Sequence, residues 1–300
     1  MSIDSAQGFE FDRACGNTPL IRISNKLYAK LETFNPTGSV KDRMISYVVA
    51  KATRSGLISP GNTIVCEATS GNSGIALAAV AASIGSRCVI FIPTNMSNER
   101  KQMMKIYGAE IVEAPADDFT AAIHMRDEFL ATNPNSWSPM QFSNPDNVEC
   151  HRAITASEIS LKLWVMNLKW SAFVHGSGTG GTIEGVRRYV RSGNTFTKNN
   201  GGPTKVCMVI PAESPHGIQG ISDGKDFLAK QEDMDETIVI KTDEAKDRAM
   251  TFAKETGLLV GISSGANLLA AERWIAANDP DGVVVTILAD RGERYMSLYT

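Results

Sequence analysis

Short apolar segments alternate with segments of helical periodicity along most of this 300-residue chain. We predict strands at 63–67, 87–92, 110–113, 171–175, 205–210 and 283–288. We predict helices at 72–84, 97–107, 117–130, about 146–168, 182–190, 243–256 and 266–277. This alternation is typical of α/β proteins, in which helices cover both faces of mainly parallel sheets. The polar stretch 133–145 is the expected boundary between two lobes.

Charge and cysteine usage exclude several classes of protein. A net charge of −3 and the lack of a long basic run argue against a nucleic-acid partner. The short cluster of Arg187, Arg188 and Arg191 is expected to be a solvated helix end. The 5 cysteines form no CxxC pair, which favours free thiols in a reducing compartment.

The N-terminal segment carries acidic residues and lacks the apolar core of a signal peptide. The most apolar predicted helix segment, 75–84, is too short to cross a bilayer. We therefore expect a cytoplasmic protein without a membrane partner. The four histidines show no metal-ligand spacing and no G-x-S-x-G elbow occurs, so neither metal nor serine hydrolysis is expected.

The stretch 35–43 follows a strand-like run, 27–34, and opens an amphipathic helix. Apolar side chains then recur at helical spacing, at Val40, Met44, Tyr47 and Val48. Ser39 and Asp42 are spaced as a capping pair at the helix start. Lys41 falls in the first turn, where the helix dipole and desolvation both favour the neutral amine that Schiff-base chemistry needs. A solvated surface lysine is the alternative.

Three loops rich in glycine and hydroxyl residues each precede a predicted helix, where backbone N–H groups favour an anion. Residues 69–74 suit a carboxylate, although a capped turn is an alternative. Residues 176–182 form a cup suited to a phosphate, and also match the G-x-G-x-x-G dinucleotide fingerprint, with Glu213 as the candidate ribose acid. Residues 261–265 offer either a helix cap or a hydroxyl for a ring nitrogen.

Taken in order, these stretches resemble the cysteine synthase (O-acetylserine sulfhydrylase) family of fold-type II pyridoxal-phosphate enzymes. Matching pieces run through nearly the whole chain: Gly16–Leu20, Lys30–Glu32, Ser39–Arg43, Thr69–Asn72, Tyr107–Glu110, Gln141–Phe142, Gly178–Thr182, Gly261–Gly265 and Gly292–Tyr295. The resemblance implies two lobes, each a mainly parallel twisted sheet flanked by helices, as in the tryptophan synthase β-like fold. The smaller, mobile lobe would be 35–145, and the larger would be 1–34 with 146–300.

The resemblance also implies a site. Lys41 would be the catalytic Schiff-base lysine of pyridoxal 5′-phosphate, and the phosphate would lie on Gly178, Thr179, Gly180, Gly181 and Thr182. Asn72 would contact the ring hydroxyl, and Ser263, in preference to Ser264, the ring nitrogen. The substrate carboxylate would be held by Thr69, Ser70, Gly71, Ser73 and Gln141.

The implied reaction is β-elimination of acetate from O-acetyl-L-serine to an aminoacrylate, followed by addition of sulfide or thiosulfate to give L-cysteine or S-sulfocysteine. The loop Gly178–Thr182 resembles A-type enzymes, whereas Ala289–Gly292 resembles B-type enzymes, which also accept thiosulfate. Alternatives are a related enzyme that uses O-phosphoserine, or serine as in cystathionine synthases, and, more distantly, an NAD-binding oxidoreductase. The implied partners are a second copy in a homodimer and the tail of a serine acetyltransferase.

Overall fold

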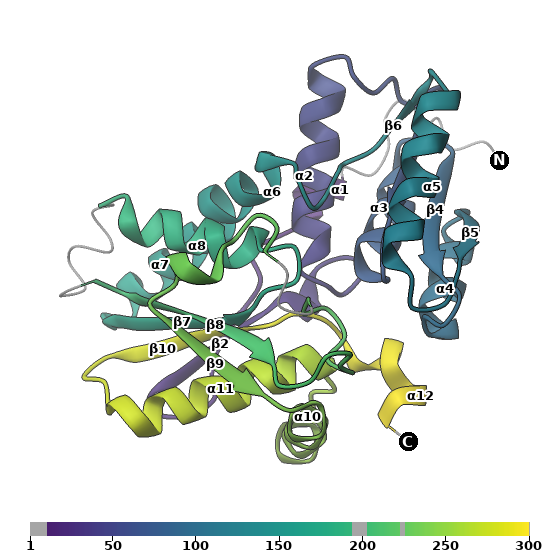
Figure 1. Ribbon diagram of the computed structural model, residues 1–300. Coiled ribbons are helices and arrows are strands. Elements are labelled where there is room, and N and C mark those ends of the chain that lie inside the picture. Colours follow the sequence, from purple (N-terminus) through teal and green to yellow (C-terminus); the bar gives the residue numbers. More distant parts are fainter. Residues whose placement is uncertain (1–10, 194–202, 223–225, 300) are drawn as a thin grey trace. The chain divides into compact units, whose positions relative to one another are not determined.

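The computed structural model describes residues 11–193, 203–222 and 226–299 (Figure 1). The acidic residues Asp4 and Glu10 of the N-terminal segment lie outside the described residues. The chain forms two compact units. Unit 1 combines the described part of Met1–Cys15 with Asn35–Met140, and unit 2 combines Gly16–Phe34 with Gln141–Thr300 as far as it is described.

Unit 1 is built on a parallel sheet in the order β5-β4-β3-β6. Its strands are β3 (Ile64–Ala68), β4 (Cys88–Pro93), β5 (Glu110–Ala114) and β6 (Ser136–Trp137). Its helices are α1 (Phe11–Ala14), α2 (Lys41–Arg54), α3 (Asn72–Ser83), α4 (Asn98–Ile106) and α5 (Phe119–Thr132).

Side chains of β4 alternate between two apolar clusters, as the two-residue period of a strand requires. Ile90 and Ile92 pack in a cluster with α2 and α3, whereas Val89 and Phe91 pack in a second cluster with Ala122 of α5. Helices therefore cover both faces of the sheet, which explains why β4 is apolar at every position. Residues 75–81 of helix α3 are all buried, and this explains why the helix is apolar nearly all round.

Unit 2 is built on a six-stranded sheet in the order β1-β2-β10-β7-β8-β9. Its strands are β1 (Leu20–Arg22), β2 (Leu27–Leu31), β7 (Trp170–Gly176), β8 (Lys205–Pro211), β9 (Glu236–Ile240) and β10 (Val283–Leu288), and only the β1–β2 pairing is antiparallel among them. Its helices include α6 (Pro145–Cys150), α7 (Ala156–Val165), α8 (Gly181–Arg191), α10 (Thr242–Thr256), α11 (Ile262–Asn278) and α12 (Met296–Tyr299). Short 3-10 turns lie at Glu32–Phe34, Gln231–Asp233 and Gly292–Tyr295.

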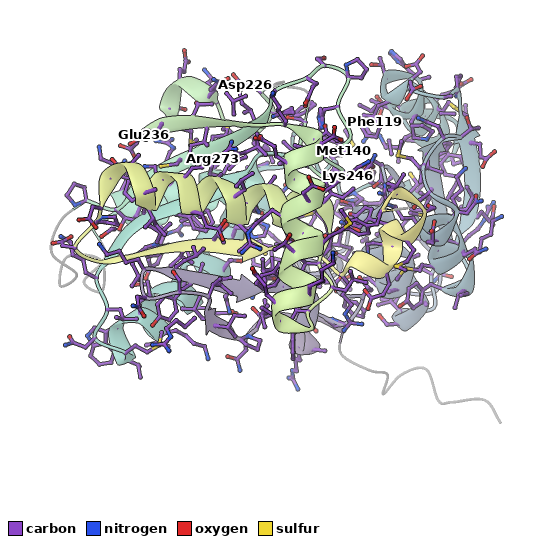
Figure 2. The ribbon with its side chains drawn as sticks, turned by 90° about the horizontal axis from the view of Figure 1, so that it is seen from below. Phe119, Met140, Asp226, Glu236, Lys246 and Arg273 are labelled. Carbon is purple, nitrogen blue, oxygen red and sulfur yellow. The ribbon has the colours of Figure 1, made fainter. Side chains whose placement is uncertain are left out.

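Helices α10 and α11 pack against one face of this sheet, and α10 crosses α11 (Figure 2). Gly265 of α11 permits the close crossing, because a Cβ there would lie 2.0 Å from the carbonyl oxygen of Ala245 in α10. Arg273, labelled in Figure 2, adds an ion pair of 2.7 Å from α11 to Glu244 of α10. The side chain of Trp274 donates to Glu236 at the start of β9.

The structure confirms the α/β fold class and most predicted elements. The predicted helix at about 146–168 is present as one helical run from Pro145 to Val165, but its middle, His151–Thr155, is a π-helical segment between α6 and α7 that was not predicted. Strand β9 was missed, because Ile240 is the one buried residue of its five and its apolar pattern is short.

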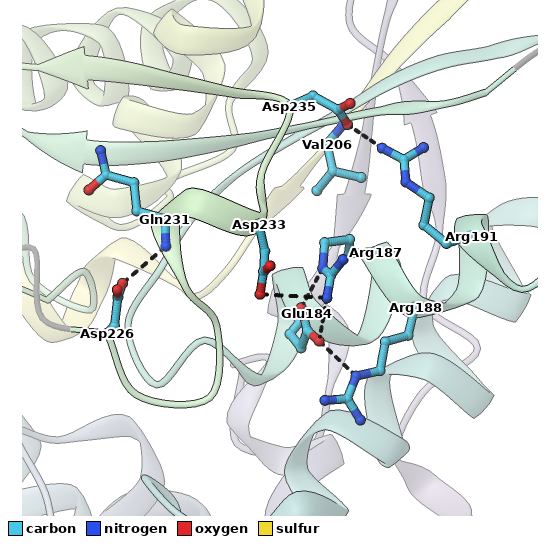
Figure 3. Close-up of polar contacts among 9 residues, drawn as sticks. All are labelled: Glu184, Arg187, Arg188, Arg191, Val206, Asp226, Gln231, Asp233 and Asp235. Carbon is cyan, nitrogen blue, oxygen red and sulfur yellow. Dashed lines mark hydrogen bonds and ion pairs between the residues drawn. The ribbon is translucent and has the colours of Figure 1, made fainter.

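The arginine cluster was predicted to be a solvated helix end, but its residues are paired (Figure 3). Arg187 and Arg188 each donate to Glu184 at 2.7 Å, and the guanidinium of Arg191 contacts Asp235. Burial by itself would raise the pKa of the Glu184 carboxyl, but the hydrogen bonds from the two arginines hold that pKa below its usual value. A carboxyl whose pKa is lowered by folding stabilises the fold at pH values above the pKa that this carboxyl has in the unfolded chain. That stabilisation is lost as the pH falls through the lower pKa of the folded state.

We predict that Glu184→Gln lowers the free energy of unfolding at pH 7 by about 1 kcal/mol, since these pairs are partly screened by solvent. The difference from wild type should shrink as the pH falls below the ordinary glutamate pKa of 4.5, where the wild-type carboxyl is also neutral. Urea unfolding of both proteins between pH 7 and pH values below about 4.5 measures this difference in the free energy of unfolding. Glu232→Gln is the control, because Glu232 is 77% exposed and its contact with Lys230 spans 3.6 Å. A loss of stability that is independent of pH would contradict the assignment.

Candidate active site

The candidate segments of both units lie at or just before the start of a helix. In unit 1, Lys41 is the first residue of α2, and the loop Thr69–Gly71 leads from β3 into α3, which begins at Asn72. In unit 2, the loop from β7 enters α8 at Gly181, and Ser263 lies in the first turn of α11. Gln141 is buried just before α6.

The turn before Lys41 is held by Asp42, although not in the way the sequence predicts. Asp42 does not cap with Ser39; its carboxylate instead accepts the backbone N–H of Thr37 at 2.7 Å and the Thr37 hydroxyl. The Ser39 hydroxyl accepts the N–H of Lys41 at 3.3 Å. The predicted apolar face of α2 is confirmed, because Val40, Met44 and Val48 are buried. Lys41 itself is half-buried, and its position is fixed by the turn.

The loop 69–73 in unit 1 turns its backbone carbonyls toward the protein. Arg100 of α4 donates from Nη1 to the carbonyl of Ser70 at 2.7 Å. The Thr69 hydroxyl accepts the N–H of Gly71 at 3.0 Å, and the Gly71 carbonyl accepts the N–H of Ile75. The loop leads into the first turn of α3, a place where backbone N–H groups and the helix dipole favour an anion.

Two observations show that position 71 needs a glycine. Its φ of +155° is rarely adopted by residues with a side chain, and a Cβ would lie 2.3 Å from Cδ of Arg100. Near the end of β3, which leads into this loop, Glu67 is fully buried and paired with Arg126 of α5 at 2.8 Å. Sequence reasoning missed Arg100 and Arg126 as supports of the loop, since their partners lie far away along the chain.

The loop 176–182 in unit 2 forms a cup of backbone N–H groups. Its carbonyls are engaged on the outside, because Ser177 O accepts the N–H of Ser222 at 2.9 Å and Thr179 O accepts that of Leu228 at 3.0 Å. The hydroxyl residues Thr179 and Thr182 are buried beside the first turn of α8. The backbone N–H groups at the start of α8 and the positive end of the helix dipole favour an anion at this place.

The glycines of the cup allow a close approach that no other residue permits. A Cβ at Gly178 would lie 2.4 Å from the carbonyl oxygen of Gly220, and one at Gly181 would lie 2.0 Å from Oδ1 of Asn147. A Cβ at Gly180 would lie 2.5 Å from the backbone nitrogen of Ala229. Because packing excludes a side chain at these three glycines, their backbone is left open to a ligand, and the cup fits a phosphate group.

Two residues, one in α6 and one in the π-helical segment that follows it, contact the cup. Neither was predicted from the sequence to have a role in the site. His151 is buried and lies between two hydroxyls, with Nδ1 2.9 Å from Thr155 and Nε2 3.2 Å from Thr182. Asn147 donates to the carbonyl of Gln141 at 2.9 Å and to the hydroxyl of Thr179 at 3.1 Å. The sequence offered one signal for them, since both lie on a predicted helix that packs in the core. Buried amide and imidazole groups need polar partners, so their presence there indicates contacts with other segments.

The two serines at the start of α11 have different surroundings. The Ser264 hydroxyl accepts the N–H of Ala289 at 2.9 Å and so joins α11 to the end of β10. Ser263 lies beside Gly220, which also packs against Gly178 of the cup. Ser263 is therefore the serine closer to the cup, whereas Ser264 has a structural bond.

Within the described residues, no cluster of three histidine, cysteine or acidic residues is suited to hold a metal ion. No helix in the described ranges combines the length and apolar character that a membrane span needs.

Comparisons with known proteins agree on one kind of chemistry. A family model described as "Pyridoxal-phosphate dependent enzyme" matches residues 11–290. A probable cysteine synthase of Bacillus subtilis is 39% identical, over 94% of each chain. The solved O-acetylserine-dependent cystathionine β-synthase of Helicobacter pylori is 32% identical, with a TM-score of 0.85 over 99% of this chain and 98% of that one. A cysteine synthase of Entamoeba histolytica is 34% identical, with a TM-score of 0.84 over 99% of this chain and 92% of that one.

We predict that Gly71→Ala displaces the loop 69–73 and raises the KM for an amino-acid substrate by about tenfold or more, because small misplacements of binding groups are costly. Steady-state kinetics measure the effect. Gly61→Ala is the matched control, since Gly61 also has a positive φ, +75°, but nothing lies within 4 Å of its added Cβ. Equal KM values for the two variants would contradict a binding role for the loop.

Proposed function

Since the chain belongs to the family of pyridoxal-phosphate dependent enzymes, and within it to the cysteine synthases, we propose that it replaces the acetate of O-acetyl-L-serine with sulfur. Sulfide as the donor gives L-cysteine, and thiosulfate gives S-sulfocysteine. The observation that carries this proposal is the cup at the start of α8, where packing excludes a side chain at Gly178, Gly180 and Gly181. A cup of this kind is suited to the phosphate of the cofactor.

The roles of the residues follow from their chemistry. We infer that Lys41 carries the cofactor, that residues 178–182 hold its phosphate, and that Asn72 and Ser263 contact its ring. Bound pyridoxal phosphate supplies an electron sink for charge that develops at the substrate α-carbon. The Lys41 amine, when free, would take the proton from that α-carbon.

The substrate carboxylate is assigned to Thr69, Ser70, Gly71, Ser73 and Gln141. Holding it fixes the α-carbon proton near the lysine amine, which is a gain of orientation. A neutral hydroxyl at Ser263 would not hold the ring nitrogen of the cofactor protonated. The bound cofactor would then be a moderate electron sink, which would favour rapid loss of acetate.

A second candidate is a related β-replacement that makes cystathionine, because the Helicobacter pylori enzyme matches nearly the whole chain. O-phosphoserine and serine are the alternative acceptors. The dinucleotide alternative has less support, because Glu213 accepts hydrogen bonds from the backbone N–H and the hydroxyl of Thr242 at the start of α10. It also leaves Lys41 and the loop 69–73 without a role.

Four further expectations remain predictions. A homodimer, docking of a serine acetyltransferase tail and movement of residues 35–145 as a smaller lobe come from the resemblance, and a cytoplasmic location comes from the cysteine usage and the N-terminal sequence.

The proposed activity is tested by supplying the purified protein with O-acetylserine and either sulfide or thiosulfate, and measuring the amino-acid products. Parallel reactions use O-phosphoserine with sulfide, and serine or O-acetylserine with homocysteine. The proposal expects the highest kcat/KM with O-acetylserine and an inorganic sulfur donor. A higher value with homocysteine would favour the cystathionine reaction, and no turnover of any acceptor would overturn both.

We predict that Lys41→Ala reduces turnover to background and removes the visible absorption of the purified protein, because the variant lacks the amine that binds the cofactor and moves the α-proton. Lys51→Ala is the control, since Lys51 is an exposed lysine further along the same helix. Retained turnover in Lys41→Ala would show that another group performs this chemistry.

A further inference from the structure

Asn147 lies on α6 where this helix packs against the start of α8 (Figure 1). Its side chain is buried, with 2% of its surface exposed. It contacts two segments of the candidate site, since it bonds the carbonyl of Gln141 at 2.9 Å and the hydroxyl of Thr179 at 3.1 Å. No sequence motif pointed to this residue, and its polar contacts need an explanation because buried amides are costly unless they are bonded.

The orientation of the Asn147 amide follows from its partners. The Gln141 carbonyl oxygen can only accept a hydrogen bond, so the group that faces it must be the amide nitrogen. That nitrogen carries two hydrogens, and the second is directed to the hydroxyl oxygen of Thr179. The amide oxygen then faces Gly181, where an added Cβ would lie only 2.0 Å from it. The tight contact with Gly181 keeps the amide in this orientation.

These contacts determine the direction of the Thr179 hydroxyl. A hydroxyl has one hydrogen to donate and two lone pairs that accept. Its oxygen accepts from Asn147 Nδ2 at 3.1 Å and, more weakly, from the backbone N–H of Gly181 at 3.4 Å. With both lone pairs engaged, the Thr179 hydrogen is left to donate to another group. A donor is what an anion bound in the cup requires.

We infer that Asn147 is a positioning residue that turns the Thr179 hydroxyl into a donor toward the phosphate, and that ties the backbone of Gln141 to the same point. This rests on the proposed function, in which the cup holds the cofactor phosphate. An aspartate at 147 would have nearly the same shape but only acceptor atoms. It would capture the Thr179 hydrogen, face the Gln141 carbonyl with a like partial charge, and bring a negative charge close to the phosphate.

The test measures binding of pyridoxal phosphate and of pyridoxal to the protein freed of cofactor, by quenching of tryptophan fluorescence. The ratio of the two dissociation constants isolates the contribution of the phosphate group. Asn147→Asp should reduce the preference for pyridoxal phosphate roughly 10- to 100-fold, as expected when a hydrogen bond to a charged group is lost. It should also shift the ³¹P resonance of the bound phosphate, a signal that a general loss of stability does not move.

The matched control is Asn144→Asp, which adds the same charge at the start of the same helix. Its side chain serves as an acceptor for the N–H of Asp146 at 2.9 Å, a role that aspartate keeps. This site is half-buried, so solvent and salt screen the added charge, and we expect a change of less than about threefold. Circular dichroism and thermal unfolding establish that both variants fold.

A second comparison links the effect to Thr179. In a Thr179→Val background the hydroxyl is absent and only the added charge acts, so Asn147→Asp should reduce the phosphate preference less than in the wild type. Equal reductions in the two backgrounds would overturn the inference. So would Asn147→Asp protein that keeps the wild-type preference for pyridoxal phosphate.

The failure of the inference can be told apart from the failure of the proposed function. Wild-type protein that shows no preference for pyridoxal phosphate over pyridoxal would overturn the phosphate assignment of the cup, and the inference with it. A wild-type preference that the Asn147 variant retains would overturn the inference alone.

Discussion

The start of an α-helix presents backbone N–H groups without partners in the helix, and the candidate site depends on this constraint in both units. Unit 1 presents such groups at the loop 69–73 before α3, and unit 2 presents them at the cup before α8. In both cases the loop follows the carboxyl end of a parallel strand, where α/β proteins bind their ligands. A carboxylate and a phosphate are the anions that these positions favour.

Supports behind these loops decide whether the N–H groups are available. Arg100 holds the Ser70 carbonyl in unit 1, while Asn147 and His151 bond the Thr179 and Thr182 hydroxyls in unit 2. Each support is itself buried, so its polar atoms have few alternative partners. The loop residues thus depend on supporting residues whose contacts the sequence does not reveal, and these contacts help to determine which groups of the loop can meet a ligand.

The sequence predicted the α/β alternation and the positions of β4, β8 and β10 well, because buried strands are continuous apolar runs. It did not predict the π-helical segment at His151–Thr155, since nothing in the local apolar periodicity distinguishes this segment from an α-helix. The capping role assigned to Asp42 was wrong for a similar reason. Thr37 competes for the same carboxylate, and spacing alone cannot decide between partners.

Some residues of the site can be found from a sequence motif, whereas others can be found only from their contacts in the folded chain. Gly178 and Gly181 are visible in the sequence as a pattern, and packing explains why glycine is needed there. Asn147 becomes visible only when α6 is packed against α8, because its partners lie at positions 141 and 179. The cofactor could be predicted from the ordered set of motifs, whereas the residues that orient the donors could not.

The central claim, that Lys41 carries pyridoxal phosphate, is tested most directly by reducing the purified protein with borohydride and mapping the modified peptide by mass spectrometry. The account predicts a single pyridoxyl phosphate adduct on the peptide that contains Lys41. An adduct on a different lysine, or none after pyridoxal phosphate has been supplied, would contradict it.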